Sequence, residues 1–232
     1  MVSKTSGRNP DLTAPNPDQP AANLYNFWMS NESTPTFPRL DPATPAFWDA
    51  RFEADFVPWD HGGVPQCLAD FVAAQTTPVH TLIPGCGSAH EVRFFAERGW
   101  PVLAIDFAAS AVGRAQRLLG PHAAHVREAD FFGPELKAGD YDLIYERAFM
   151  CALPRAMREA WAVRVAELLK PGGVLAGFFF FDTTPKGPPF GTDQAELNAL
   201  LAPAFEHIET RTPADSIPVF VGKEQWQVWR KR

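Results

Sequence analysis

Apolar stretches alternate with amphipathic stretches along most of this chain. The pattern predicts strands at 79–83, 101–106, 125–129, 141–145 and 173–181, with two final strands near 204–211 and 225–230. Helical spacing of apolar residues predicts helices at 88–98, 108–119, 155–169 and 193–202. Repeated strand–helix units of this kind predict an α/β fold: a Rossmann-like, seven-stranded, mostly parallel sheet flanked by helices.

The amino-terminal part has a different pattern. Residues 1–22 are rich in Pro, Asn, Asp and Ser, and we expect a disordered or loosely ordered segment. Residues 23–62 hold many aromatic side chains, and a helical pattern starts at Pro45, followed by a second helix at 65–75. We interpret residues 23–232 as a single domain, with 23–62 as an aromatic lid segment.

The stretch from Thr81 to Asp106 carries the most informative chemistry. An apolar strand runs into the tight turn Gly85-Cys86-Gly87, a helix follows, and the next strand ends on Asp106. This is the layout of a nucleoside-cofactor site at the carboxyl ends of two parallel strands. The glycines let the backbone approach a ligand closely because they have no Cβ. Asp106 is placed to accept hydrogen bonds from two ribose hydroxyls.

These residues also have plainer interpretations. Gly85 and Gly87 could be glycines of an ordinary strand–helix turn, and Asp106 could cap the next helix. Asp130 could be a solvated turn residue, and Arg147 could pair with a surface carboxylate. The third glycine of a dinucleotide fingerprint is absent, which weakens that signal, but this segment alone still leaves a nicotinamide dehydrogenase open.

Three later segments favour S-adenosyl-L-methionine (SAM) as the cofactor. Glu128–Phe132 follows the third strand with a carboxylate and an aromatic ring, which suit an adenine. Asp140–Arg147 forms a strand that ends in charged residues, and Leu168–Gly173 leads into the fifth strand. This order of turns resembles the Rossmann-like SAM-dependent methyltransferase fold. A dehydrogenase would also need a catalytic domain, for which little chain remains.

Further motifs narrow the resemblance. The spacing of Trp48, Phe52 and Trp59-Asp60 is similar to the amino-terminal aromatic motif of the thiopurine S-methyltransferase superfamily, which includes the plant thiol and halide methyltransferases. Four further stretches are similar to the same superfamily: Ile83–Gly87, Asp130–Phe132, Gly187–Phe190 and Cys151–Pro154, the last followed by Arg158, Trp161 and Ala162.

The resemblance implies a cofactor site and an activity. Its cofactor-binding residues would be Trp48, Phe52, Trp59, Gly85, Gly87, Asp106, Asp130, Phe131 and Arg147. A methyl group would pass from SAM, by in-line displacement and without a metal, to a small soft nucleophile, and S-adenosyl-L-homocysteine (SAH) would remain. A thiol, a thiopurine or a related sulfur or halide acceptor is favoured.

The acceptor side is less defined. Candidates for its pocket are Phe180, Phe190 and Glu146, and no catalytic residue is assigned. Phe180 stands where the plant enzymes carry tyrosine, which leaves S, O/N and halide specificity open. An O- or N-methyltransferase would need a general base, for which Glu146 and Asp182 are the first suspects. A non-catalytic SAM-binding protein is the third hypothesis.

Composition limits the partners and the compartment. The net charge of −6 argues against nucleic acid, and the longest apolar run, Val174–Phe181, is too short to span a bilayer. The three scattered cysteines, Cys67, Cys86 and Cys151, suggest neither a disulfide framework nor a zinc site, and no signal peptide is visible. We therefore expect a cytoplasmic protein with a small-molecule acceptor. Its oligomeric state is unknown, with a monomer slightly favoured.

Overall fold

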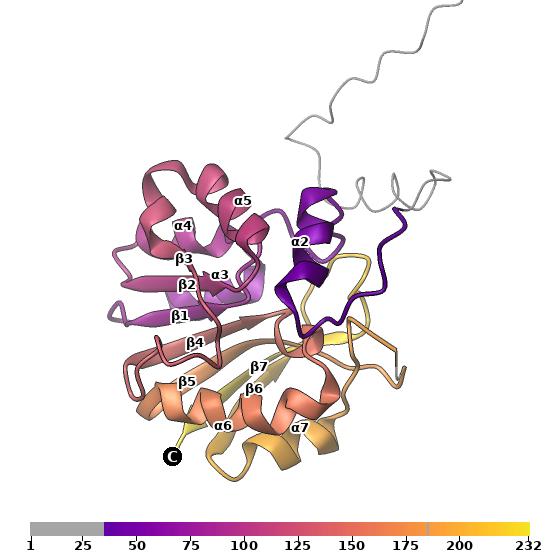
Figure 1. The fold of residues 1–232 in the computed structure, drawn as a ribbon. Helices are drawn as coiled ribbons and strands as arrows, with labels where there is room; N and C mark the ends of the chain where they lie inside the picture. The colour runs from indigo at the N-terminus through magenta and orange to yellow at the C-terminus, as the bar shows by residue number, and fades with distance from the viewer. Residues whose placement is uncertain (1–34, 185) are drawn as a thin grey trace, which may run out of the picture.

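One seven-stranded sheet organises the computed structural model, which describes residues 35–184 and 186–232. Its strands are β1 (Thr81–Pro84), β2 (Val102–Asp106), β3 (Val126–Glu128), β4 (Tyr141–Arg147), β5 (Leu169–Phe180), β6 (Phe205–Arg211) and β7 (Glu224–Lys231). Their order is β3-β2-β1-β4-β5-β7-β6, and only β7 runs antiparallel to its neighbours β5 and β6. The predicted α/β fold with a mostly parallel sheet is confirmed (Figure 1).

Helices cover both faces of the sheet. The α-helices of the described residues are α2 (Pro45–Glu53), α3 (Gln66–Ala73), α4 (His90–Ala96), α5 (Ala109–Leu119), α6 (Arg158–Leu168) and α7 (Gln194–Leu201), and α3 to α7 form these two layers. One core packs α3, α4 and α5 against residues such as Ile83 and Ala104, and the other packs α6 and α7 against residues such as Leu82 and Ile105. Neighbouring strand residues point to opposite faces, so each strand contributes to both cores.

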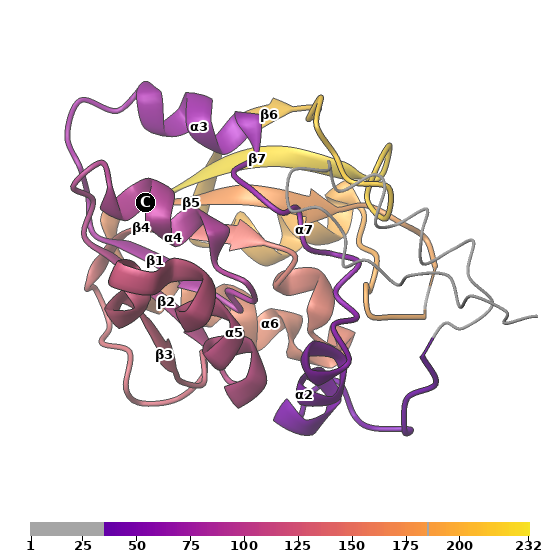
Figure 2. The same ribbon diagram turned by 90° about the horizontal axis from the view of Figure 1, so that it is seen from above.

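Helix α2 belongs to neither helical layer. It lies beyond the carboxyl ends of the parallel strands, as Figures 1 and 2 show, and packs against the start of α5, where the Ser110 N–H donates to the Asp49 carboxylate at 2.9 Å. At this edge β1 lies between β2 and β4, so the connections that leave β1 and β4 run to opposite sides. Such a switch point opens a crevice at the strand ends, where α/β proteins bind their ligands.

Two predicted boundaries differ from the structure by more than two residues. The structure starts β5 at Leu169 rather than at 173, because Leu169 already pairs with Tyr141 before the register shifts to Val174 opposite Leu143. The intervening residues, which we predicted as a turn, form an irregularity within the strand. The predicted helix at 155–169 begins as a separate 3₁₀ turn at Arg155–Met157, after which α6 runs from Arg158 to Leu168.

Part of the amino-terminal prediction lies outside the described residues. This applies to the whole of residues 1–22 and to the part of the lid segment that contains Tyr25, Phe27 and Trp28. Phe37 is described, and its ring lies 5.4 Å from that of Phe56. In the described ranges, none of the helices has the length and apolar character that crossing a membrane requires.

Candidate functional site

A cavity of about 530 Å³ opens at the carboxyl ends of the parallel strands. Its walls come from the amino-terminal segment around α2, the turn after β1, the ends of β2, β3 and β4, and the loops at 187–189 and 219–220. All nine residues predicted to bind the cofactor line it: Trp48, Phe52, Trp59, Gly85, Gly87, Asp106, Asp130, Phe131 and Arg147. Its volume lies in the range of small-molecule sites, roughly 300–1,000 Å³.

The glycine turn holds the Asp106 carboxylate at the cavity wall. Gly85 and Gly87 have φ values of +57° and +50°, which side chains other than glycine adopt at a cost. Asp106 is 7% exposed and accepts hydrogen bonds from the backbone N–H groups of Gly87 (3.1 Å) and Ala108 (3.0 Å). Burial raises the pKa of Asp106 to about 6, although these N–H groups oppose the rise.

Three aromatic rings of the amino-terminal segment form one wall. The Trp59 ring lies edge-on to both Trp48, with centroids 5.5 Å apart, and Phe52, with centroids 5.9 Å apart. The Trp48 indole N–H also donates to the carbonyl of Pro42 at 2.8 Å. Edge-to-face rings of this kind attract one another, so each ring stabilises the orientation of its neighbour. Phe52 reaches the turn itself, because a Cβ on Gly87 would lie 3.5 Å from its ring.

Asp60 ties this aromatic wall to the glycine turn. Its carboxylate accepts a short hydrogen bond from the Ser88 hydroxyl and lies 3.0 Å from Nε2 of His90. Burial alone would raise the pKa of Asp60, but the His90 and Ser88 contacts bring it down to about 2. The pKa of His90 is raised, because the pairing with Asp60 outweighs its burial. Our sequence analysis gave Asp60 no role, although it directly follows Trp59.

The other end of the cavity is lined by residues that follow β3 and β4. Asp130 is exposed and accepts a hydrogen bond from the Phe132 N–H at 2.9 Å, while Phe131 is buried. The Phe131 ring lies edge-on to Phe149, with centroids 5.2 Å apart. Phe149 was missed from the sequence, yet it covers Gly85 so closely that a Cβ there would collide with its ring.

Arg147 brings a positive charge to the cavity. Its Nη1 lies 3.5 Å from the Glu224 carboxylate, and its guanidinium carbon lies 4.2 Å from the centre of the Phe178 ring. The remaining guanidinium nitrogens, Nε and Nη2, are buried without a hydrogen-bond partner. The buried Glu91 carboxylate also lines the cavity and accepts from the Tyr145 hydroxyl at 3.3 Å.

The predicted acceptor-side residues lie outside the cavity lining. Phe180 packs against Phe220, with ring centroids 5.6 Å apart, and Phe190 lies next to it behind the wall. The buried Glu146 carboxylate accepts from the N–H groups of Phe149 (2.9 Å) and Met150 (3.1 Å). Burial raises the pKa of Glu146 to about 7, yet the group faces backbone rather than the cavity.

Asp182 also lies outside the cavity lining. It accepts hydrogen bonds from Thr184 and pairs with Lys223, and the pKa of this carboxyl is lowered mainly by the Lys223 contact. Neither carboxylate suggested as a general base is therefore placed to take a proton from a ligand in the cavity. Among the residues that the structure describes, no group of three or more His, Cys, Asp or Glu is arranged to hold a metal ion.

Comparison with known proteins agrees with this geometry. The model of the thiopurine S-methyltransferase (TPMT) family matches residues 43–232. Thiocyanate methyltransferase 1 of Arabidopsis thaliana is 31% identical over 192 residues, which cover 79% of this chain and 84% of that protein. Thiopurine S-methyltransferase of Vibrio cholerae is 28% identical over 176 residues, 67% of this chain and 80% of that protein.

A solved SAM-dependent methyltransferase from Methanosarcina mazei superimposes with a TM-score of 0.60 at 16% identity, covering 73% of this chain and 98% of that chain. At this identity the likeness shows the fold alone.

Proposed function

We propose an acceptor class and residue roles for this chain, which belongs to the thiopurine S-methyltransferase family and is a SAM-dependent methyltransferase. The acceptor that we propose is a small, soft, anionic nucleophile: a thiolate, a thiopurine, thiocyanate or a halide. The observation that carries the proposal is that Arg147, whose Nε and Nη2 lack hydrogen-bond partners among the described residues, lines the same cavity as Asp106, the glycine turn and the aromatic wall.

The cavity suits SAM on three counts. The Asp106 carboxylate accepts only backbone N–H groups among the contacts found, and its oxygens can also accept ribose hydroxyls. Gly85 and Gly87 lack the Cβ that would narrow the cavity, and Asp130 and Phe131 offer a carboxylate and a ring for adenine. The rings of the aromatic wall attract a sulfonium by about 0.5–2 kcal/mol.

Bound SAM supplies a methyl group on a positively charged sulfur. The protein then has to orient the acceptor in line with that group and exclude water. Orientation of this kind recovers about 7–11 kcal/mol of a barrier, more than the roughly 10²–10⁴-fold of a general base. An acceptor that binds already ionised needs no base, which agrees with the placement of Glu146 and Asp182 away from the cavity.

Arg147 supports an anionic partner, because its guanidinium at the cavity carries N–H groups that lack acceptors. We propose that it attracts either the carboxylate of SAM or the acceptor anion. Substitution Arg147→Met tells the two apart. A higher Kd for SAM alone indicates the first, and a higher KM for the acceptor with unchanged SAM affinity indicates the second.

The experiment that tests the function is transfer of a labelled methyl group from SAM to a panel of thiols, thiopurines, thiocyanate, halides, phenols and amines. We expect transfer to sulfur acceptors or halides, and calorimetric binding of SAM and SAH. Transfer only to phenols or amines would refute the soft-acceptor proposal. If neither SAM nor SAH binds, the assignment of the cavity as the cofactor site is refuted.

We also propose a cytoplasmic location. The three cysteines are all free thiols in the structure, which suits a reducing compartment. Cell fractionation tests this, and recovery of the protein from an oxidising compartment would contradict it.

A further inference from the structure

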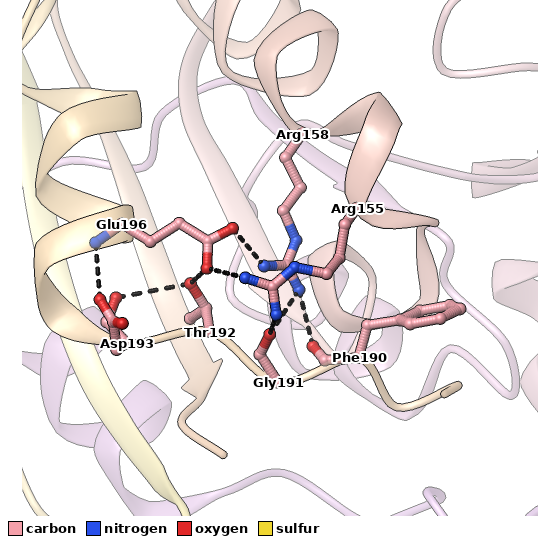
Figure 3. Close-up of polar contacts among 7 residues, drawn as sticks. All are labelled: Arg155, Arg158, Phe190, Gly191, Thr192, Asp193 and Glu196. Carbon is pink, nitrogen blue, oxygen red and sulfur yellow. Dashed lines mark hydrogen bonds and ion pairs between the residues drawn. The ribbon is translucent and has the colours of Figure 1, made fainter. Parts of the chain in front are cut away.

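One wall of the cavity is a short loop whose backbone is held by two arginines outside the cavity, Arg155 and Arg158. Gly187, Pro188 and Pro189 line the cavity, whereas the next residues, Phe190 and Gly191, turn away from it. Figure 3 shows the guanidinium groups of both arginines lying between the backbone of these last two residues and a glutamate on α7. We call this group of contacts the loop clamp.

Arg158 is the centre of the loop clamp. It is 2% exposed, and its Nη2 donates to the carbonyls of Phe190 (2.8 Å) and Gly191 (2.9 Å). Its Nη1 donates to the Glu196 carboxylate at 2.7 Å. A guanidinium presents its donors in a rigid plane, so one side chain reaches two carbonyls and a carboxylate at once. Lysine has the same charge but cannot make this pattern.

A second arginine completes the arrangement from the surface. Arg155 donates to the Gly191 carbonyl at 3.0 Å and to Glu196 at 2.7 Å. Thr192 donates to the same carboxylate at 2.9 Å. Glu196 thus balances two cations and joins α7 to the start of α6. Because both arginines meet at the Gly191 carbonyl, the loop is fixed relative to two helices.

The wall residues depend on this anchoring. Pro188 and Pro189 have no N–H group and cannot anchor their segment by donating hydrogen bonds. The nearest backbone anchor on the cavity side is the Phe190 N–H, which donates to the Cys151 carbonyl at 2.6 Å. Cys151 itself lines the cavity. A shift of the Phe190 backbone would therefore displace the wall directly.

The position of this wall in the sheet assigns it to the acceptor rather than to the nucleoside. The loop follows β5, whereas Asp106 ends β2, and the sheet order places β1 and β4 between them. Three strand spacings correspond to about 14 Å. The strand that leads into the loop is therefore well removed from the strand that carries the carboxylate proposed to hold the ribose.

We propose that Arg158 is a positioning residue that sets acceptor selectivity by holding the Gly187–Pro189 wall. This rests on the proposed function, because it assumes that an acceptor occupies the cavity next to that wall. Arg158 does not line the cavity and acts through the carbonyls of Phe190 and Gly191. When the clamp is weakened, the wall moves, and small and bulky acceptors are no longer distinguished.

The test compares Arg158→Lys and Glu196→Gln with wild type, using thiocyanate as the small acceptor and thiophenol as the bulky one. We expect the kcat/KM of the better acceptor to fall roughly 10–100-fold, since a displacement of about 1 Å has this effect. We also expect the ratio of the two kcat/KM values to move toward one, through acceptor KM, while the Kd for SAM stays within about twofold.

A matched control uses the same helix. Arg164 on α6 donates to the carbonyls of Phe131, Gly133 and Leu136, on the opposite side of the site. We expect Arg164→Lys to leave the acceptor ratio at the wild-type value. If Arg158→Lys does not fold, the comparison rests on Glu196→Gln and on a further variant, Arg155→Gln, because Glu196 is 26% exposed and Arg155 is 47% exposed.

The outcomes separate this inference from the proposed function. If wild type transfers no methyl group to any acceptor of the full panel, the function fails. If wild type is active but the folded clamp variants keep the wild-type acceptor ratio and KM, the positioning role is refuted. A loss of kcat or melting temperature alone, without a change in that ratio, would also refute it and leave a purely structural role.

Discussion

The most direct perturbation of the proposed cofactor site is Asp106→Asn. Asparagine preserves the size of the side chain and one carbonyl oxygen, but it removes the charge. In the structure the two carboxylate oxygens accept from different N–H groups, Gly87 at 3.1 Å and Ala108 at 3.0 Å. The amide can replace only one of them as an acceptor, so one backbone N–H loses its partner.

The size of the effect follows from the charge. Hydrogen bonds to charged groups contribute about 1.5–3 kcal/mol, so we expect the Kd for SAM to rise roughly 10–100-fold at pH 7.5. The pKa of about 6 adds a pH signature. Ribose hydroxyls favour the ionised carboxylate, so wild-type affinity rises as the pH increases from 5 to 7.5, and Asp106→Asn lacks that rise.

The same raised pKa makes a prediction about stability. The folded protein holds the Asp106 proton more tightly than the unfolded chain, whose pKa is near 3.8. The free energy of unfolding of the wild type therefore falls as pH rises from about 4 through about 6. Asp106→Asn lacks this carboxyl, so its free energy of unfolding rises relative to that of the wild type over the same pH range.

Calorimetric titration at several pH values measures the Kd for SAM, and urea unfolding followed by circular dichroism at the same pH values measures the free energy of unfolding. An unchanged Kd for SAM in folded Asp106→Asn, or a pH slope that persists in it, would refute the assignment.

Three further predictions use other parts of the site. Trp59→Leu is expected to reduce the preference for SAM over SAH between about twofold and about thirtyfold, the equivalent of a cation–π contact; equal losses for both nucleosides would argue for packing instead. Gly85→Ala is expected to lower the free energy of unfolding by at least about 1 kcal/mol through its positive φ, and by more because its Cβ meets Phe149. Gly62→Ala, with φ +72° and open space, is the control, and equal melting temperatures would contradict the collision. Asp60→Asn is expected to cost about 2 kcal/mol of stability at pH 7, because the pKa is lowered from 3.8 to about 2. This difference in free energy of unfolding between wild type and Asp60→Asn disappears as pH falls from about 4 to about 2. Urea unfolding at several pH values measures it, and a difference that stays constant with pH would contradict the prediction.

Much of the fold could be predicted because the relevant signals are local. The strands predicted at 101–106 and 204–211 match β2 and β6 within about one residue. The glycine turn and the carboxylate at the end of β2 are also local, so their side-by-side placement follows from parallel pairing of β1 with β2. The boundary of β5 could not be predicted, because its first pair depends on the partner residue Tyr141.

The site was predicted unevenly for the same reason. Residues at the ends of strands and in the aromatic motif were placed in the cavity by sequence alone. Phe180 and Phe190 were predicted for the acceptor pocket, and the structure does not place them among the residues that line the cavity. A strand pattern does not tell which face of β5 meets the cavity, and Phe190 turns away where its backbone meets Arg158.

The chain by itself determined the fold class, the order of its elements and the chemistry at the ends of the first strands, because each depends on residues close together in sequence. Only the tertiary structure decided which distant groups meet: Phe149 over Gly85, Asp60 on Ser88, and Arg158 behind the loop. Such contacts join segments that are brought together by the strand order, and no local pattern of residues encodes that order.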